Sequence, residues 1–369
     1  MCLWCSGIVR GVVGRVVHGG DIEAVALRYG VSPENLIDFS ANIDSHGPPP
    51  GVAEILAEAA KNPRLLSAYP SSTLYASARA SIAEAVGVDS DGIVIGPGGA
   101  ALIDLAIRCI AADTITVPIP AFSEYARAIA ACGKTMHELE LPPDFQLDAH
   151  AAAVSDGSAL LVNTPHNPSG ATLARRDMEG VLAACEETSR EFIVDEAFID
   201  YVPEQGIAAS AQDSQRALVI RSLTKFYGLA GLRVGYLVTH PAKAAKLRAT
   251  LPSWPVGTME LEIARACVED RAYAERTRAR VARDRAELGA SLRSIGITVY
   301  PSAANFLLLE LPCPLERFDD ILQALVQRRG IVVRDCRTYR GLEMRPLIRA
   351  AVLSRESNKR LCNALREML

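Results

Sequence analysis

The stretch Arg221-Ser222-Leu223-Thr224-Lys225-Phe226-Tyr227-Gly228-Leu229-Ala230-Gly231-Leu232-Arg233 decides how this sequence is interpreted. It places Lys225 three residues after Ser222 and eight residues before Arg233. A lysine amine condenses with an aldehyde, whereas hydroxyls and a guanidinium bind a phosphate. These residue types in this order predict a binding site for pyridoxal phosphate, with the cofactor attached to Lys225. On its own, the stretch also fits a surface lysine beside a glycine-rich turn.

Three segments upstream place polar or glycine-rich sequence directly after an apolar run. Residues 191–198 form an apolar run that ends in Asp195 and Glu196. Such a run suits a parallel strand whose carboxyl end faces a site. The segments 163–170 and 96–100 each follow an apolar run, and the second opens a helical pattern. Because a glycine-rich turn before a helix presents free N–H groups to a phosphate, the segments together favour the cofactor site.

With these motifs, the chain resembles fold-type I pyridoxal phosphate enzymes of the class I/II aminotransferase group, from about His18 to the C-terminus. Within the group it looks most like the threonine-phosphate decarboxylases of the cobalamin pathway, and histidinol-phosphate aminotransferases are close relatives. The segments that favour the decarboxylases are His18-Gly19-Gly20-Asp21, Asp38-Phe39-Ser40-Ala41-Asn42-Ile43, Gly47-Pro48-Pro49-Pro50 and Val333-Arg334-Asp335-Cys336-Arg337.

The resemblance implies an α/β fold with a large domain, built on a mostly parallel seven-stranded type of sheet, and a small α+β domain. Apolar runs that alternate with helical patterns agree with such a sheet. We expect strands at 93–95, 114–117, 160–162, 192–195, 217–222 and 234–238, and a long helix over about 260–294. The expected organisation is an N-terminal segment 1–50 that joins the small domain, a cofactor-binding domain 51–257, and a bridging helix with the small domain at 258–369.

Composition argues against several other classes of protein. The net charge of −4 does not suit a nucleic-acid binder, which normally carries a basic patch. No run of about 20 apolar residues is present, so no membrane-spanning helix is expected. Nine scattered cysteines fit free thiols in the cytoplasm better than a disulfide framework. Cys2 and Cys5 form a lone pair, so no metal site is expected, and residues 1–17 do not have the pattern of a signal peptide.

The resemblance also implies roles in cofactor binding. Asp195 pairs with the ring nitrogen of the cofactor, and Asn167 donates to its phenolic oxygen. Phe122 lies on the ring face, although core packing is the alternative. Tyr69 reaches the phosphate from the partner subunit, which makes the protein a homodimer with shared active sites. The other residues expected to bind the phosphate are Gly99, Ala100, Ser222, Thr224 and Arg233.

The expected substrate is a small amino acid with two anionic groups. A planar guanidinium matches both oxygens of an α-carboxylate, and Arg349 corresponds to the carboxylate-binding arginine of the family. His18, Gly19, Asn42 and Arg334 correspond to the positions that bind the side-chain phosphate, and Asn167 is expected to contact the substrate as well. Arg337 and Arg345 are close enough in sequence to contribute, whereas a solvated surface charge is the alternative for Arg340 and Arg345.

Three departures from the family pattern bear on the reaction. Histidinol-phosphate aminotransferases usually have a tyrosine where this chain has Phe198, which favours the decarboxylase. Side-chain contacts to the phosphate are fewer at residues 97–101, and residues 341–346 replace a glycine-rich approach to Arg349.

The expected function is decarboxylation of threonine phosphate. The alternatives are an aminotransferase acting on histidinol phosphate, an enzyme acting on phosphoserine or a phosphonate amino acid, and a non-enzymatic pyridoxal-binding domain.

Overall fold

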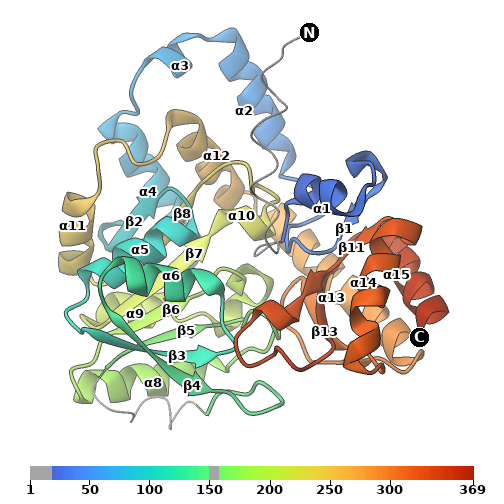
Figure 1. Cartoon of the computed structure of the whole chain (residues 1–369). Coiled ribbons are helices and arrows are strands. Elements are labelled where there is room, and N and C mark those ends of the chain that lie inside the picture. The colour runs from blue at the N-terminus through green and yellow to red at the C-terminus, as the bar shows by residue number, and fades with distance from the viewer. Residues whose placement is uncertain (1–18, 149–157) are drawn as a thin grey trace, which may run out of the picture.

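The computed structural model describes residues 19–148 and 158–369. His18, Cys2 and Cys5 lie outside these residues. The left-hand half of Figure 1 contains a seven-stranded sheet in the order β2-β8-β7-β6-β5-β3-β4. All neighbouring strands run parallel except β8, which is antiparallel to β2 and β7. The strands are β2 (Ile93–Gly96), β3 (Thr114–Ile119), β4 (Thr135–Glu140), β5 (Ala159–Asn163), β6 (Phe192–Asp195), β7 (Ala217–Ser222) and β8 (Gly235–Val238).

Helices cover both faces of this sheet, which explains why its central strands are continuous apolar runs. Alternate residues of each strand enter different cores. Val194 packs in a core with α4, α8, α9, α12 and α13, whereas Ile193 packs in a second core with α5, α6 and α11. These helices are α4 (Ser72–Val86), α5 (Gly99–Cys109), α6 (Ser123–Ala131), α8 (Arg175–Glu187), α9 (Ala208–Asp213), α11 (Pro241–Thr250), α12 (Thr258–Glu269) and α13 (Arg271–Arg293).

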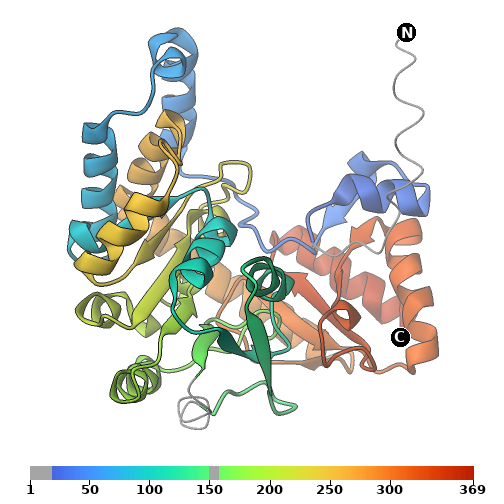
Figure 2. The same cartoon turned by 60° about the vertical axis from the view of Figure 1, so that its left-hand side comes forward.

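A smaller antiparallel sheet forms the other half of the molecule, in the order β12-β13-β10-β9. Its core contains residues of α13, α14 and α15, together with Phe39 from the N-terminal segment. Strand β1 (Ile37–Asp38) pairs with β11 (Ile331–Val332), so the blue N-terminal part lies beside the red C-terminal part in Figures 1 and 2. The remaining elements are β9 (Thr298–Val299), β10 (Phe306–Glu310), β12 (Arg334–Asp335), β13 (Leu347–Ala351), α14 (Leu315–Arg329), α15 (Arg355–Met368) and α1 (Ile22–Tyr29).

Short helices connect these parts. Helix α10 (Leu223–Phe226) follows β7 directly and carries Lys225, while α2 (Pro50–Lys61) and α3 (Arg64–Ser67) precede α4. Among the described residues, single turns of 3₁₀-helix lie at Pro33–Asn35, Ser90–Gly92, Ile199–Tyr201, Pro203–Gln205 and Cys336–Thr338. Within the described part of the chain, no helix is long and apolar enough to cross a membrane.

The structure differs from the sequence prediction at two elements. The sheet has an edge strand, β4, that the apolar pattern did not indicate, because none of its residues is buried and polar residues alternate with Met136 and Leu139 only in part. The single helix expected over about 260–294 is two helices, α12 and α13. Asp270 lies between them and its side chain accepts a hydrogen bond from the backbone N–H of Tyr273 at 2.8 Å. An aspartate in this position caps a new helix, and this explains the break.

Candidate active site

A cavity of about 530 Å³ lies where the carboxyl ends of β5 and β6 approach the small sheet. Residues from the N-terminal segment, from both sheets and from α10 line it. Of the residues predicted from the sequence, those that line this cavity are Gly19, Asn42, Phe122, Asn167, Asp195, Lys225, Arg334 and Arg349. The structure therefore brings together residues that are far apart in the chain: Gly19 and Arg349 are 330 positions apart.

Lys225 lies on the first turn after β7, with Ser222 as the N-cap of α10. Burial, together with the nearby charges of Arg349 and Arg233, lowers the pKa of its amine to about 8, and the charge of Asp195 opposes this shift. A lysine with such a pKa has a substantial unprotonated fraction near neutral pH. This is the form that attacks an aldehyde.

Asp195 is the last residue of β6 and is buried. The hydroxyl of Tyr125 donates to its Oδ2 at 2.6 Å, and the N–H of Ala197 donates to its Oδ1 at 3.0 Å. Burial raises the pKa of the carboxyl, and the two donated hydrogen bonds oppose this shift. Because both oxygens are held by donors, the carboxylate has a fixed orientation at the cavity wall, as a partner for a protonated ring nitrogen requires.

Asn167 and Arg349 are joined by Tyr339 in a closed group of hydrogen bonds. Arg349 donates through Nη1 to Asn167 Oδ1 and, at 3.0 Å, to the hydroxyl of Tyr339. Tyr339 in turn donates to Asn167 Oδ1 at 3.0 Å, while Arg349 Nη2 donates to the carbonyl of Ser40 at 2.9 Å. All three side chains of the group are buried. The backbone N–H of Asn167 donates to Asn163 Oδ1 at 2.7 Å, and this fixes the loop after β5.

Arg334 lies opposite Arg349 in the small sheet, since the two residues are Cα partners of β12 and β13. Its Nη2 donates to Thr338 Oγ1 at 2.8 Å, and its guanidinium lies 5.4 Å from the centre of the Tyr339 ring. Gly19 approaches Ser40 so closely that an added Cβ would lie 2.1 Å from its carbonyl oxygen. A glycine is therefore required at position 19, and Asn42, also buried, continues the same wall.

Two phenylalanines contribute apolar surface to the cavity. Phe122 precedes α6 and packs edge to face on Tyr125, with ring centres 5.7 Å apart. Phe198 packs edge to face on Phe306, with ring centres 5.1 Å apart. The wall after β6 therefore presents a ring without a hydroxyl where the related aminotransferases are expected to have a tyrosine.

The residues predicted to bind the phosphate from the same chain form a group next to Lys225, although they do not line the cavity itself. The hydroxyls of Ser222 and Thr224 lie 2.7 Å apart. The turn between β2 and α5 packs on them, because a Cβ added at Gly99 would lie 3.6 Å from the Cβ of Ser222. Ala100 follows in the first turn of α5, so that both residues belong to the helix N-terminus.

Arg233 closes this group from the other side. Gly98 has φ of +89°, and a Cβ added there would lie 2.8 Å from Arg233 Nη2. The guanidinium is held through Nη1, which donates to the carbonyl of Ala230 at 3.3 Å. Two hydroxyls, a helix N-terminus and a guanidinium thus converge beside Lys225. Such a set of donors suits a phosphate.

Four of the residues considered from the sequence lie away from the cavity or at its edge. Tyr69 is 73% exposed and stacks on Trp254, with ring centres 3.9 Å apart. Arg337 pairs with Asp335 at 2.9 Å, and Arg345 pairs with Glu310 at 2.8 Å. Neither arginine lines the cavity. Arg340 lies at its edge, where it is exposed and pairs with Glu138 at 2.6 Å.

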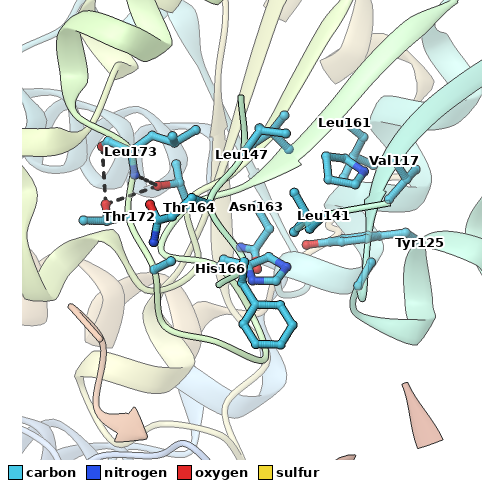
Figure 3. Close-up of a pocket in the computed structure, with 16 residues that line it drawn as sticks. Val117, Tyr125, Leu141, Leu147, Leu161, Asn163, Thr164, His166, Thr172 and Leu173 are labelled. Carbon is cyan, nitrogen blue, oxygen red and sulfur yellow. Dashed lines mark hydrogen bonds between the residues drawn. The ribbon is translucent and has the colours of Figure 1, made fainter. Parts of the chain in front are cut away.

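A second cavity, of about 20 Å³, lies behind the first and is shown in Figure 3. Ala121, Tyr125 and Asn163 line both cavities. His166 lies at its wall and binds the carbonyl of Pro120 through Nε2 at 2.8 Å and the hydroxyl of Ser169 through Nδ1 at 2.7 Å. Burial lowers the pKa of His166 to about 4, so it is neutral at pH 7 and joins two loops of the site.

These residues fit pyridoxal phosphate on several independent grounds. Among the residues that line the main cavity, Arg349 Nε and Asn42 Oδ1 are buried and have no hydrogen-bond partner in the described part of the chain. With Arg340 paired to Glu138, the remaining charged groups at the wall are Lys225, Arg334 and Arg349 against Asp195. An excess of positive charge and the unused N–H of Arg349 suit an anionic ligand, whereas the unused oxygen of Asn42 can only accept a hydrogen bond.

Sequence reasoning did not find Tyr125, Tyr339 and Ser40. Tyr125 lies three residues after Phe122, one helical turn further along the chain, where the sequence around Phe122 could have indicated it. Tyr339 contacts Asn167 across 172 positions of the chain. Ser40 acts through its backbone carbonyl, and no side-chain pattern indicates such a contact.

Comparison with known proteins agrees with this geometry. The family model of aminotransferase class I and II matches residues 34–365. A threonine-phosphate decarboxylase of Salmonella typhimurium is 33% identical over 95% of this chain and 96% of its own length. A histidinol-phosphate aminotransferase of Mycobacterium bovis is 34% identical over 86% of this chain and 84% of its own length.

The fold is also that of solved relatives. A histidinol-phosphate aminotransferase of Sinorhizobium meliloti, solved in complex with pyridoxal-5'-phosphate, aligns with a TM-score of 0.83, covering 95% of this chain and 94% of its own, at 21% identity. The chain belongs to the aminotransferase class I and II family. It is therefore an enzyme of a pyridoxal phosphate-dependent family, and this confirms the predicted fold class and cofactor.

Proposed function

We propose that this enzyme decarboxylates an O-phosphorylated L-amino acid, and that L-threonine O-3-phosphate, which would give (R)-1-aminopropan-2-yl phosphate, is the best candidate. The observation that carries the proposal is the pair Arg334 and Arg349. Both side chains are buried, both line the cavity that contains Lys225, and they are direct partners across β12 and β13. Two buried guanidiniums beside one reactive amine suit a substrate with two anionic groups.

Each arginine has a separate role in this proposal. Arg349 binds the α-carboxylate through the planar fork of N–H donors of its guanidinium, and Arg334 binds the side-chain phosphate together with Asn42. Holding a substrate at both ends fixes which bond at Cα is aligned for cleavage. The similarity to the threonine-phosphate decarboxylase of Salmonella typhimurium over nearly the whole chain supports this choice of substrate.

The proposed reaction breaks the bond between Cα and the carboxylate carbon. The electron pair stays on the Cα side, CO₂ leaves, and a proton is added at Cα. The bound cofactor supplies a conjugated system that accepts this electron pair. Lys225, whose amine has a pKa of about 8, delivers the proton from Nζ to Cα. Asp195, held by Tyr125 and the N–H of Ala197, keeps a negative charge at the ring nitrogen.

Phe198 favours decarboxylation over transamination in this proposal. A tyrosine in its place would donate a hydrogen bond to the phenolic oxygen of the cofactor, and the ring of Phe198 instead packs on Phe306. The second candidate function is transfer of the amino group of a phosphorylated amine such as histidinol phosphate, and the relative in Mycobacterium bovis favours it. Decarboxylation of phosphoserine or of a phosphonate amino acid would use the same two arginines.

The test is incubation of the cofactor-loaded enzyme with O-phospho-L-threonine, O-phospho-L-serine and a phosphonate amino acid, with CO₂ release as the readout. Parallel tubes contain histidinol phosphate with 2-oxoglutarate, and glutamate is measured. We expect CO₂ from phosphothreonine and no glutamate. Glutamate without CO₂ would instead establish the aminotransferase.

Variants separate the anion site from general effects of charge. Arg334→Gln is expected to raise the KM for phosphothreonine by at least about tenfold, because a buried charge pair is lost. Arg345→Gln is the matched control: it removes an arginine from the same part of the fold, but one that pairs with Glu310 outside the cavity. An equal effect of the two substitutions would contradict the role of Arg334.

A further inference from the structure

Tyr339 contacts three of the polar side chains on the substrate side of the cavity. It is 7% exposed and follows the 3₁₀ turn Cys336–Thr338, between β12 and β13. Its hydroxyl bonds to Arg349 and Asn167, and its ring lies beneath the guanidinium of Arg334. The family resemblance assigned no role to this residue.

The hydroxyl of Tyr339 and the guanidinium of Arg349 together determine which way the amide of Asn167 faces. A guanidinium can only donate, so the atom of Asn167 that faces Arg349 must be the oxygen, Oδ1. Tyr339 donates its single proton to the same oxygen and accepts from Arg349 Nη1. With two donors on Oδ1, the NH₂ group of Asn167 is turned away from both of them. The amide therefore presents a donor to the ligand in the cavity rather than an acceptor.

The ring of Tyr339 acts on the second arginine. Arg334 and Arg349 are Cα partners in neighbouring strands, and like charges that lie directly opposite in a sheet repel each other. The guanidinium of Arg334 lies 5.4 Å from the centre of the Tyr339 ring, which attracts a cation through its electron-rich face. One side chain thus holds Arg349 by its hydroxyl and Arg334 by its ring, and so fixes the separation of the two cations.

We propose that Tyr339 is the positioning residue that sets the spacing of the two anion-binding arginines and the orientation of the Asn167 amide. This inference rests on the proposed function, because it assigns Arg349 and Arg334 to the two anions of the substrate. It goes further by naming the residue that selects substrates according to the distance between their carboxylate and phosphate groups.

The first measurement uses the cofactor-loaded enzyme without substrate. The visible absorbance of the bound cofactor changes with pH. The pKa of this change depends on hydrogen-bond donors to the phenolic oxygen, and Asn167 is the expected donor. Tyr339→Phe removes the hydroxyl and keeps the ring. We expect this pKa to rise by about half a unit to one unit, as loss of one hydrogen bond implies. Tyr300→Phe is the matched control, because its hydroxyl bonds to Glu310 in the same sheet and outside the cavity.

The second measurement compares dissociation constants for O-phospho-L-threonine and L-threonine, read from the change in cofactor absorbance. Tyr339→Phe is expected to weaken binding of both ligands by about tenfold, because Arg349 loses one of its three hydrogen-bond partners. Tyr339→Leu also removes the ring, and it is expected to lower the preference for the phosphorylated ligand by about fivefold. Tyr300→Phe is expected to match the wild type.

The outcomes distinguish this inference from the proposed function. A wild-type enzyme that binds phosphothreonine no better than threonine would overturn the proposed substrate, and the absorbance titration would still decide the role of the hydroxyl. A Tyr339→Phe enzyme that titrates as the wild type does would overturn the orientation of Asn167 by Tyr339. A Tyr339→Leu enzyme with an unchanged preference for the phosphorylated ligand would overturn the spacing role.

Discussion

Tyr125→Phe removes one hydroxyl from the wall between the two cavities, and its effect can be worked out from the structure. The hydroxyl donates to Asp195 Oδ2 at 2.6 Å, and both side chains are buried. A hydrogen bond to a charged group contributes about 1.5–3 kcal/mol, compared with about 0.5–1.5 kcal/mol for a neutral pair. Since 1.36 kcal/mol corresponds to one pKa unit, loss of this bond is expected to raise the pKa of Asp195 by about one unit.

The sign of the pH dependence follows from the direction of the existing shift. Burial already raises the pKa of Asp195 above its ordinary value, so the folded protein binds this proton more tightly than the unfolded chain. The contribution of Asp195 to stability is therefore largest at low pH and falls as the pH rises through the folded-state pKa. Because Tyr125→Phe raises that pKa further, its cost is expected to be about 1 kcal/mol below the pKa of Asp195 and about 2–3 kcal/mol above it.

The assay is urea unfolding of the cofactor-free protein at pH 8 and at a pH below the pKa of Asp195. Tyr201→Phe is the control, because Tyr201 is also buried and its hydroxyl has no hydrogen-bond partner among the described residues. Its loss leaves no donor unsatisfied, so we expect the midpoint of Tyr201→Phe to equal or exceed that of the wild type. A cost of Tyr125→Phe that is the same at both pH values would refute the assignment of its hydroxyl to the ionised carboxylate.

Three further predictions concern the cofactor and the oligomer. The rate at which the cofactor-free protein captures pyridoxal phosphate is expected to rise about tenfold per pH unit and to level off above the Lys225 pKa of about 8; a rate that still rises at pH 10 would contradict this pKa. Gly98→Ala is expected to weaken cofactor binding at least about tenfold, because Gly98 has φ of +89° and the new Cβ meets Arg233. Equilibrium titration measures this, and Gly180→Ala, where the added Cβ meets open space, is the control that is expected to leave binding unchanged. If Tyr69 completes the site of a partner subunit, then a mixture of inactive Lys225→Ala with Tyr69→Ala is expected to regain activity through hybrid dimers, and no recovery would argue for sites within one chain.

Apolar runs predicted the central strands because those strands are covered on both faces. The segment 192–195 is buried at every position, and its first three residues form the apolar run that the prediction used. Strand β4 is the opposite case. It lies at the sheet edge and contains His137, Glu138 and Glu140, and its pairing with β3 comes from backbone hydrogen bonds that no side-chain pattern indicates. Edge position, rather than low strand propensity, explains the omission.

In the site, too, the residues that local sequence indicates differ from those whose role depends on distant contacts. Lys225, Asp195 and Asn167 lie at or shortly after the ends of strands, where local motifs indicated them before any contact was known. Tyr339 lies in no such motif, and its importance comes from contacts with residues at 10 and 172 positions from it in the chain. A sequence pattern carries information about neighbours along the chain, whereas a hydroxyl shared between two distant side chains depends on how the two sheets meet.

The pairing of β12 with β13 gives a physical reason for the proposed substrate with two anions. Direct partners in an antiparallel pair place their side chains on the same face of the sheet, so the register forces Arg334 and Arg349 to the same side. Two buried guanidiniums in this arrangement repel each other and have lost much of their hydration, and burial of a charge is costly unless it is paired. The contacts with Tyr339, Thr338 and Ser40 offset part of that cost, while Arg349 Nε is left without a partner among the described residues. The site is therefore more favourable with negative charge at both arginines, and a ligand with one anion would neutralise only half of the charge that the register creates.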